Sequence, residues 1–326
     1  MQRTLNKYCF FIFASIVIFV FLRCSGSALC DSCSIKELTQ EEKQELQAAL
    51  GRNFFFDKRF SKDNSISCSS CHVPEKAFTD GESLSLGVGE RVGFRNAPTL
   101  LNVRDASTFM FDAEITSLEQ QAIVPIQDHA EMDMRMGDLV EKLNKDVHYV
   151  DAAFRLYGRP LDAYVITRAL AAFERTLISV DSRFDQFYAS QDSSVLNANE
   201  LAGWEVFKKL DCISCHQLPH FTDYKAHTTQ MSFYENDLGR FRVSGQSKDV
   251  GAFRTPSLRN IELTAPYKHD GSEFDLTRLV SLHRFGNKDG TIAIPKVDYE
   301  RLQNETELIV SFLGSLTDTS YLTAFP

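Results

Sequence analysis

Two copies of one five-residue pattern carry the clearest chemistry in this chain. They are Cys68-Ser69-Ser70-Cys71-His72 and Cys212-Ile213-Ser214-Cys215-His216. The pattern C-x-x-C-H is the attachment signature of c-type haem, in which both cysteines form thioether bonds to the porphyrin and the histidine binds the iron. One copy in 326 residues can arise by chance, but a copy in each half of the chain predicts two covalently bound haems.

A zinc site with four cysteine ligands is the competing interpretation of these two cysteine pairs. Zinc does not require a histidine directly after each pair, so the pattern favours haem. A third pair, Cys30 and Cys33, has no such histidine, because Ser34 follows it. For this pair a local disulfide in an oxidising compartment is favoured over a redox role.

The first 28 residues have the pattern of a secretory signal peptide. Arg3 and Lys7 precede an apolar run from Tyr8 to Leu22, and small residues lead to Ala28, after which we predict cleavage. The run is short for a bilayer span, which needs about 20 residues, so a retained N-terminal anchor is the weaker alternative. Export suits c-type haem, which is attached outside the cytoplasm. We therefore expect a periplasmic protein with no stable membrane span after signal cleavage.

The composition is acidic, with a formal net charge of −9. Loss of residues 1–28 removes three basic residues and no acidic residue, which leaves a net charge of about −12 by the same count. Such a surface argues against nucleic acid and anionic membranes as partners, and it favours a partner with a basic contact patch.

The pattern of apolar residues predicts a mostly helical protein. Thr39 and Glu42 form a capping box before a helix that we expect to stop at Gly51. A long apolar periodicity covers residues 161–188, and further helices are expected after Asn199, after Asp275 and over about 304–316. We expect the second of these to carry His283 on its apolar face and the first to carry Trp204 in its core.

The predicted fold is two cytochrome c-like haem domains packed against each other, related by a loose internal duplication. We place the N-terminal domain at 29–190 and the C-terminal domain at 191–326, because a polar, turn-rich stretch covers 190–199. The last helix is able to pack back on the N-terminal domain.

Short blocks of sequence resemble the bacterial dihaem cytochrome c peroxidases and their relatives, the MauG and MbnH proteins. The resemblance extends from about Leu50 to Gly286. Its blocks are Phe55-Phe56-Asp57-Lys58-Arg59-Phe60-Ser61, Phe78-Thr79-Asp80-Gly81, Arg95-Asn96-Ala97-Pro98-Thr99, Leu118-Glu119-Gln120-Gln121-Ala122, Thr255-Pro256-Ser257-Leu258-Arg259-Asn260 and Leu263-Thr264-Ala265-Pro266-Tyr267-Lys268-His269-Asp270-Gly271.

The resemblance implies that the N-terminal haem reacts with hydrogen peroxide and the C-terminal haem relays electrons. Gln121 and Glu131 fall where the family keeps the amide and the carboxylate of its peroxide pocket, and Pro125 falls where several relatives have a proline. A sheltered carboxylate can move a proton between the two peroxide oxygens, and an amide can hold the peroxide in place.

Three positions depart from the peroxidase pattern. Val88 stands where many relatives have a histidine that blocks the first haem, so we expect that haem to be open to peroxide without prior reduction. His283 stands where peroxidases have a methionine and MauG a tyrosine as the distal ligand of the relay haem. Phe111 stands where peroxidases and MauG have a tryptophan between the haems, and a phenylalanine ring is much harder to oxidise.

The resemblance also implies one calcium ion. Asn96, Thr264 and Pro266 match its ligand positions, the last two through backbone carbonyls. Amide and carbonyl oxygens suit a hard cation.

The sequence thus predicts a dihaem peroxidase-family oxidoreductase with His72, His216 and His283 as iron ligands. His283 and Val88 favour oxidation of a partner protein, as in the MauG and MbnH branch. The alternative is a cytochrome c peroxidase that takes electrons from a small cytochrome c or cupredoxin. A non-enzymatic electron carrier with two six-coordinate haems is the third interpretation.

Overall fold

A computed structural model of the chain describes residues 38–228, 237–283 and 299–325. The predicted signal peptide and the Cys30–Cys33 pair lie outside these residues. Contacts divide the chain after Gln40, and residues 41–326 form one compact unit. Among the described residues, no helix is both long enough and apolar enough to cross a bilayer.

Helices dominate the described residues, which confirms the mostly α prediction. The helices are α2 (Gln40–Phe56), α3 (Cys68–Cys71), α4 (Leu118–Gln121), α5 (Ile123–Gln127), α6 (Met136–Leu143), α7 (Val147–Tyr157), α8 (Ala163–Glu174), α9 (Arg183–Ser190), α10 (Ala198–Lys209), α11 (Phe241–Ser244), α12 (Leu276–Ser281) and α13 (Tyr299–Gly314). Strands β1 (Ala226–Thr228) and β2 (Ala252–Arg254) pair antiparallel, with Ala226 opposite Arg254.

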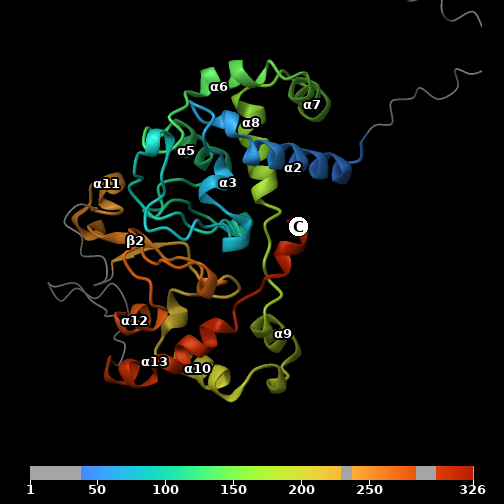
Figure 1. Ribbon diagram of the computed structural model, residues 1–326. Coiled ribbons are helices and arrows are strands. Elements are labelled where there is room, and N and C mark those ends of the chain that lie inside the picture. The colour runs from blue at the N-terminus through green and yellow to red at the C-terminus, as the bar shows by residue number, and fades with distance from the viewer. Residues whose placement is uncertain (1–37, 229–236, 284–298, 326) are drawn as a thin grey trace, which may run out of the picture. The chain divides into compact units, whose positions relative to one another are not determined.

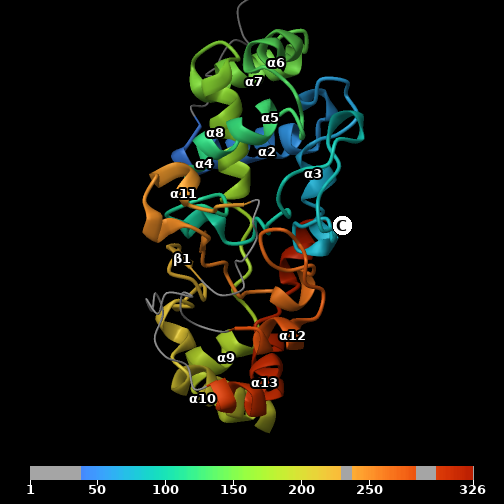
Figure 2. The same ribbon diagram turned by 90° about the vertical axis from the view of Figure 1, so that its left-hand side faces the viewer.

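The helices gather in two groups. Helices α2 to α8 form one group, and α9, α10, α12 and α13 form the other (Figures 1 and 2). The two strands lie between the groups, and α11 lies beside the first group, at the level of α3. The irregular segments between helices carry most of the residues that the sequence analysis singled out.

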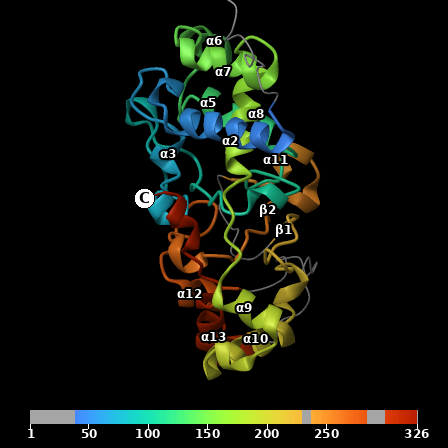
Figure 3. The same ribbon diagram turned by 90° about the vertical axis from the view of Figure 1, so that its right-hand side faces the viewer.

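The prediction that the first helix stops at Gly51 is wrong, since α2 continues to Phe56. Figure 3 shows α2 crossing α8, and Gly51 lies at the crossing: a Cβ atom there would sit 1.8 Å from the carbonyl oxygen of Ala169. The glycine permits close helix packing and is not a helix terminator. Gly203 of α10 has the same role against α13, where a Cβ would sit 1.9 Å from the Leu308 carbonyl oxygen.

Three other helix boundaries differ in part from the sequence prediction. Asn197, not Asn199, caps α10, through a capping box with Glu200. Asp275 caps α12 as predicted, but α12 ends at Ser281, so His283 follows the helix and is not on its face. The periodic stretch 161–188 is broken into α8 and α9 by an irregular segment that includes Ser179.

Trp204 belongs to an aromatic core, as predicted. It is buried against Phe184, Phe207 and Phe312, with ring centroids 5.1–6.0 Å apart. These rings come from α9, α10 and α13, so they hold the second group of helices together. Trp204 is therefore a packing residue of this group.

The two halves share a local motif that follows each haem signature. Asn102 and Asn260 both adopt left-handed backbone angles, with φ of 61° and 58°, and each precedes a 3₁₀ turn. Thr99 donates from Oγ1 to the carbonyl of Ala77, and Ser257 donates from Oγ to the carbonyl of His220. Corresponding side chains thus support corresponding turns, which is the geometry expected of a duplication.

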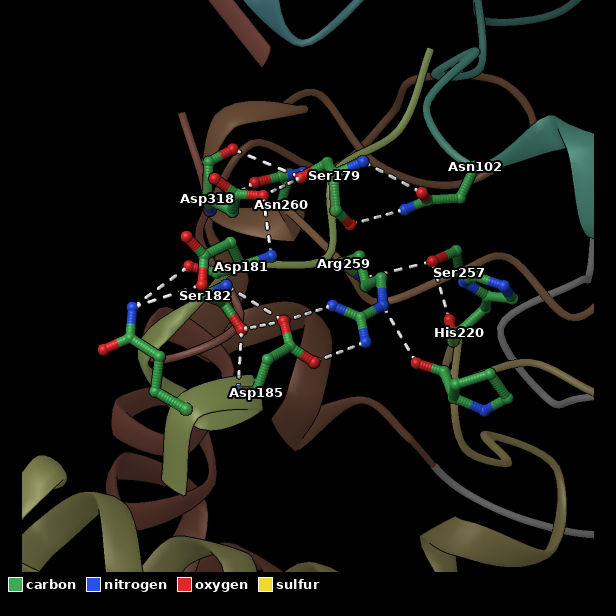
Figure 4. Close-up of polar contacts among 12 residues, drawn as sticks. Asn102, Ser179, Asp181, Ser182, Asp185, His220, Ser257, Arg259, Asn260 and Asp318 are labelled. Atoms are coloured by element: carbon green, nitrogen blue, oxygen red, sulfur yellow. Dashed lines mark hydrogen bonds and ion pairs between the residues drawn. The ribbon is translucent and has the colours of Figure 1, made fainter. Parts of the chain in front are cut away.

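A buried polar network joins these two motifs (Figure 4). Asn102 donates from Nδ2 to the Ser179 carbonyl at 2.8 Å and accepts from the Ser179 backbone N–H at 3.0 Å. Asn260 donates from Nδ2 to Ser179 Oγ at 2.7 Å, and it accepts from the backbone N–H of Asp318 at 2.7 Å. Ser179 Oγ donates to Asp318 Oδ2 at 3.0 Å. One short segment therefore fixes the motifs of both halves and the end of the chain.

The segment after α13 reaches the first group of helices. The Phe325 ring lies 5.3 Å from the Phe78 ring and 6.2 Å from the Phe173 ring. Helix α13 itself packs against α10 and α12. The chain end thus contributes apolar surface close to the first haem signature.

Replacement of Gly51 tests the helix crossing. We expect Gly51→Ala to lower the free energy of unfolding by about 1–3 kcal/mol, because α2 and α8 must separate to admit the methyl group. Gly137→Ala in α6 is the matched control, since nothing lies within 4 Å of its added Cβ, and it should be neutral or stabilising by up to about 1 kcal/mol. Urea unfolding of both variants measures the difference, and equal midpoints would contradict the close packing.

Candidate functional site

The first haem signature is a single helical turn. Cys68 and Cys71 begin and end α3, and their spacing of three residues places them on one helix face. His72 follows as the C-cap, and its Nδ1 lies 2.9 Å from the carbonyl oxygen of Phe78. That hydrogen bond orients the ring and leaves Nε2 for a metal, as in most metal-binding histidines.

The second signature repeats this arrangement. Cys212 starts a 3₁₀ turn, and His216 Nδ1 lies 3.0 Å from the carbonyl oxygen of Phe221. Phe78 and Phe221 both have positive φ, at 59° and 54°, which turns each carbonyl toward its histidine. All four signature cysteines are free of disulfides and so remain available for thioether bonds.

His216 faces His283, and their separation suits one iron atom between them. Their ring centroids are 6.4 Å apart. A metal–imidazole bond of about 2 Å on each side, plus roughly 1 Å from each nitrogen to its ring centre, gives about 6 Å. The carbonyl of Leu279 hydrogen-bonds the His283 ring, so this histidine is also held for metal binding. The residues fit a haem with two histidine ligands.

A cavity of about 290 Å³ lies around this histidine pair. Its wall includes Cys212, Cys215, His216 and His283, together with apolar side chains of both halves such as Phe111. A concave, mostly apolar wall with a few polar groups is the usual form of a cofactor site.

The ionisation of these groups also suits haem. Burial, reinforced by the neighbouring His283, lowers the pKa of His216 to about 4, and burial lowers the pKa of His72 and of His283. All three imidazoles are therefore neutral near pH 7, which is the form that binds a metal. Burial raises the pKa of Cys212 to about 12, so its thiol is protonated near pH 7.

Glu131 lies on a loop that folds back along α5. The Met132 N–H donates to the Pro125 carbonyl and the Met134 N–H to the Ile126 carbonyl. Burial, followed by the charge of Asp128, raises the pKa of Glu131 to about 7. The charge of Glu131 in turn raises the pKa of both Cys68 and Cys71, which places this carboxyl near the first signature. Gln121 ends α4, just before α5.

The Val88 loop packs directly on the Glu131 loop. The Val88 N–H donates to the Glu131 carbonyl at 2.8 Å, and a Cβ on Gly87 would sit 2.0 Å from the Ala130 carbonyl oxygen. The Val88 side chain is buried. The segment that would carry a blocking histidine therefore lies beside Glu131, and it presents an alkyl side chain that cannot bind iron.

Comparison with known proteins gives the same picture. A family model described as di-haem cytochrome c peroxidase matches residues 45–193. The methylamine utilization protein MauG of Methylorubrum extorquens is 34% identical over 276 residues, which cover 83% of this chain and 78% of that protein. The cytochrome c551 peroxidase of Nitrosomonas europaea is 33% identical over 289 residues, with 87% and 83% covered. The chain belongs to the di-haem cytochrome c peroxidase family.

A solved structure supports the same fold. The crystal structure of a MauG-like protein associated with microbial copper homeostasis superposes with a TM-score of 0.73 at 28% identity, covering 85% of this chain and 91% of that chain. Membership of the family confirms that the chain is a haem enzyme with two c-type haems.

All three predicted calcium ligands are among the described residues. Asn96, Thr264 and Pro266 all line the cavity described above. Asn96 donates from Nδ2 to the Glu82 carbonyl at 2.9 Å, which leaves its Oδ1 as a candidate ligand. Calcium binding stays a prediction. Among the residues that the structure describes, no three His, Cys, Asp or Glu side chains converge as a metal site.

Sequence reasoning missed a second carboxyl near the first signature. Glu174 ends α8, and its Oε2 is buried without a hydrogen-bond partner. Burial raises its pKa to about 8; the charge of Arg175 opposes this shift, and that of Glu119 adds to it. After burial, the charge of Glu174 is the largest influence on the pKa of the Cys68 thiol. The sequence did contain a signal for this carboxyl. Glu174 is an acidic residue on the apolar face of a predicted helix, near Leu170 and Phe173.

Glu174 should make stability pH-dependent. Its folded pKa is above its unfolded value, so the folded state holds the extra proton between about pH 4.5 and 8, and stability falls as the pH rises through that window. We expect Glu174→Gln to be more stable than the parent at pH 8, by at least about 2 kcal/mol, and nearly equal at pH 4.5. Urea unfolding at both pH values measures this.

Glu119→Gln is the control for this measurement. Burial raises the Glu119 pKa, but the hydrogen bond from Arg175, a backbone hydrogen bond and the charges of Arg175 and Arg168 together outweigh it, and the net shift of the pKa is downward. Its loss should therefore cost stability above about pH 4.5, with the sign opposite to that of Glu174→Gln. The same sign for both variants would contradict the assignment.

Proposed function

We propose that this enzyme uses hydrogen peroxide at the haem attached to Cys68 and Cys71, and draws electrons through the haem attached to Cys212 and Cys215 to oxidise a partner protein. His72 is the proposed iron ligand of the first haem, and His216 and His283 are those of the second. The observation that carries the proposal is the contrast between the two sites. One has two facing histidines 6.4 Å apart, and the other has Val88 packed beside Glu131.

When bound, the first haem supplies the iron that reacts with peroxide, and the second supplies a one-electron relay. Glu131, with a pKa of about 7, can accept a proton from one peroxide oxygen and return it to the other. Gln121 is the proposed amide that holds the peroxide or a water molecule in place. Val88 leaves the first iron accessible before any reduction.

The bis-histidine pair favours partner oxidation over simple peroxide reduction. Imidazole nitrogen stabilises ferric iron more than a thioether does, so the second haem should have a low reduction potential. Such a relay suits withdrawal of electrons from a tightly docked protein better than their uptake from a high-potential donor. The MauG relative and the MauG-like structure are consistent with this branch. An acidic surface and a predicted periplasmic location favour a secreted partner with a basic contact patch.

A cytochrome c peroxidase is the second candidate function. The relative from Nitrosomonas europaea carries that name and is almost as similar as the MauG relative. In this case a small cytochrome c or cupredoxin supplies electrons, and peroxide is reduced to water. In either case we propose a calcium ion held by the Asn96 side chain and the Thr264 and Pro266 carbonyls.

Replacement of His283 tests the relay ligands. We expect His283→Ala to convert one low-spin haem of the oxidised protein to high-spin, because one strong-field nitrogen ligand is lost. EPR and visible spectra of the oxidised protein measure this. His227→Ala is the matched control, since His227 also lines the cavity but pairs with Asp223 at 2.8 Å, and it should leave the spectrum unchanged. If the spectrum of His283→Ala were unchanged, the assignment of His283 as an iron ligand would be wrong.

Rapid mixing of the oxidised protein with peroxide separates the candidate functions. We expect a reaction without prior reduction, and a spectral change that persists without a donor if a partner protein is the substrate. If this spectral change decayed rapidly only with reduced cytochrome, the cytochrome c peroxidase function would be favoured. If peroxide caused no reaction, the remaining interpretation would be a non-enzymatic electron carrier. Glu131→Gln should slow the reaction about 10²–10⁴-fold, the usual contribution of an acid–base group. Glu119→Gln should not slow it.

A further inference from the structure

Arg254 places a positive charge in the wall of the haem cavity. It ends β2, and its side chain lines the cavity with His216, His283 and Phe111. Its Nε donates to the Met110 carbonyl at 3.1 Å, and its backbone N–H donates to the Phe111 carbonyl at 2.6 Å. These two hydrogen bonds hold the residue in place. No hydrogen bond to a described residue is made by the two terminal nitrogens of the guanidinium.

Within the described part of the chain, no carboxylate pairs with this guanidinium. Two other well-buried arginines show the usual arrangement. Arg95 contacts Asp112 at 2.9 Å and Asp237 at 2.8 Å, and Arg259 contacts Asp185 at 2.7 Å. A buried cation without a counter-ion is costly, and proteins retain one mainly where a ligand supplies the opposite charge.

The neighbours of Arg254 do not supply that charge. Tyr224 is the group whose interaction with Arg254 is strongest after burial, and burial raises the pKa of Tyr224 to about 12, so it is neutral near pH 7. Burial also lowers the pKa of Arg254. Among the described residues the guanidinium thus has no negative partner, and an anion bound in the cavity would supply one.

We propose that Arg254 binds a carboxylate of the haem attached to Cys212 and Cys215, and that it raises the reduction potential of this haem. The inference rests on the proposed function for the identity of the relay haem. A planar guanidinium with two free terminal nitrogens matches a carboxylate by two parallel hydrogen bonds. Neutralising that carboxylate removes a negative charge that would otherwise stabilise ferric iron.

The same residue connects the cavity to the other half of the molecule. Its bonds to the Met110 and Phe111 carbonyls join the proposed haem carboxylate to the segment where relatives have a tryptophan. A path of hydrogen and covalent bonds thus leads from the relay haem toward the first half through Arg254. This path does not require the Phe111 ring to be oxidised.

Redox titration of the low-spin haem in the intact dihaem protein, followed by its visible spectrum, tests the proposal. We expect Arg254→Met to lower the ratio of reduced to oxidised haem about tenfold at a fixed applied potential, a shift of about 59 mV for one electron. Arg254→Lys keeps the charge and should change the ratio less than about threefold. If Arg254→Met does not accumulate as a folded protein, Arg254→Gln gives the same readout, because its amide can still donate to Met110.

Arg240→Met is the matched control. Arg240 also donates to this segment, at the Asp112 and Ala113 carbonyls, but it pairs with Asp249 at 3.8 Å. It should leave the ratio within about twofold of the parent. A ratio for Arg254→Met within the same twofold range, or an equal shift for Arg240→Met, would overturn the proposal. The titration uses no peroxide, so failure of the proposed function to oxidise a partner is observed separately.

Discussion

The hydrogen bonds around Ser179 are the constraint on which the rest of the structure depends. They tie Asn102 in the first half, Asn260 in the second half and Asp318 near the chain end to one short segment between α8 and α9. All of these groups are buried, so each unsatisfied donor or acceptor would cost free energy. Because the two asparagines stand in equivalent turns, the network joins the turn that follows the first haem signature to the turn that follows the second (Figure 4).

The two halves are alike in the residues around each haem signature. They differ in the residues expected on the side of the haem opposite the signature histidine. His72 and His216 each bond a carbonyl presented by a phenylalanine of positive φ, and Gly51 and Gly203 each allow the helix preceding the signature to pack closely. The residues expected on the other side of each haem are not alike. His283 faces His216, whereas the first half has Glu131 and Val88 near its signature.

Among the described residues, several buried ionisable groups without an ion-pair partner lie near these sites. Arg95 and Arg259 are paired with aspartates and serve structure. Glu131, Glu174 and Arg254 are largely shielded from solvent and form no ion pair among the described residues, two of them near the first signature and one in the cavity of the second. Groups held at this cost are the ones most suited to proton transfer or to binding a charged cofactor.

The sequence alone determined the class of the protein, because C-x-x-C-H is a local pattern whose chemistry needs no tertiary contact. Its resemblance to the family blocks also singled out His283 and Glu131 as candidate site residues, and these assignments stay predictions. It misjudged Gly51, and it missed Glu174 and Arg254, because the role of each depends on a partner far away in the chain. Gly51 meets Ala169, Glu174 approaches Cys68, and Arg254 bonds Met110. Only the tertiary structure decides which charges lack partners, since burial and pairing are properties of the packed chain.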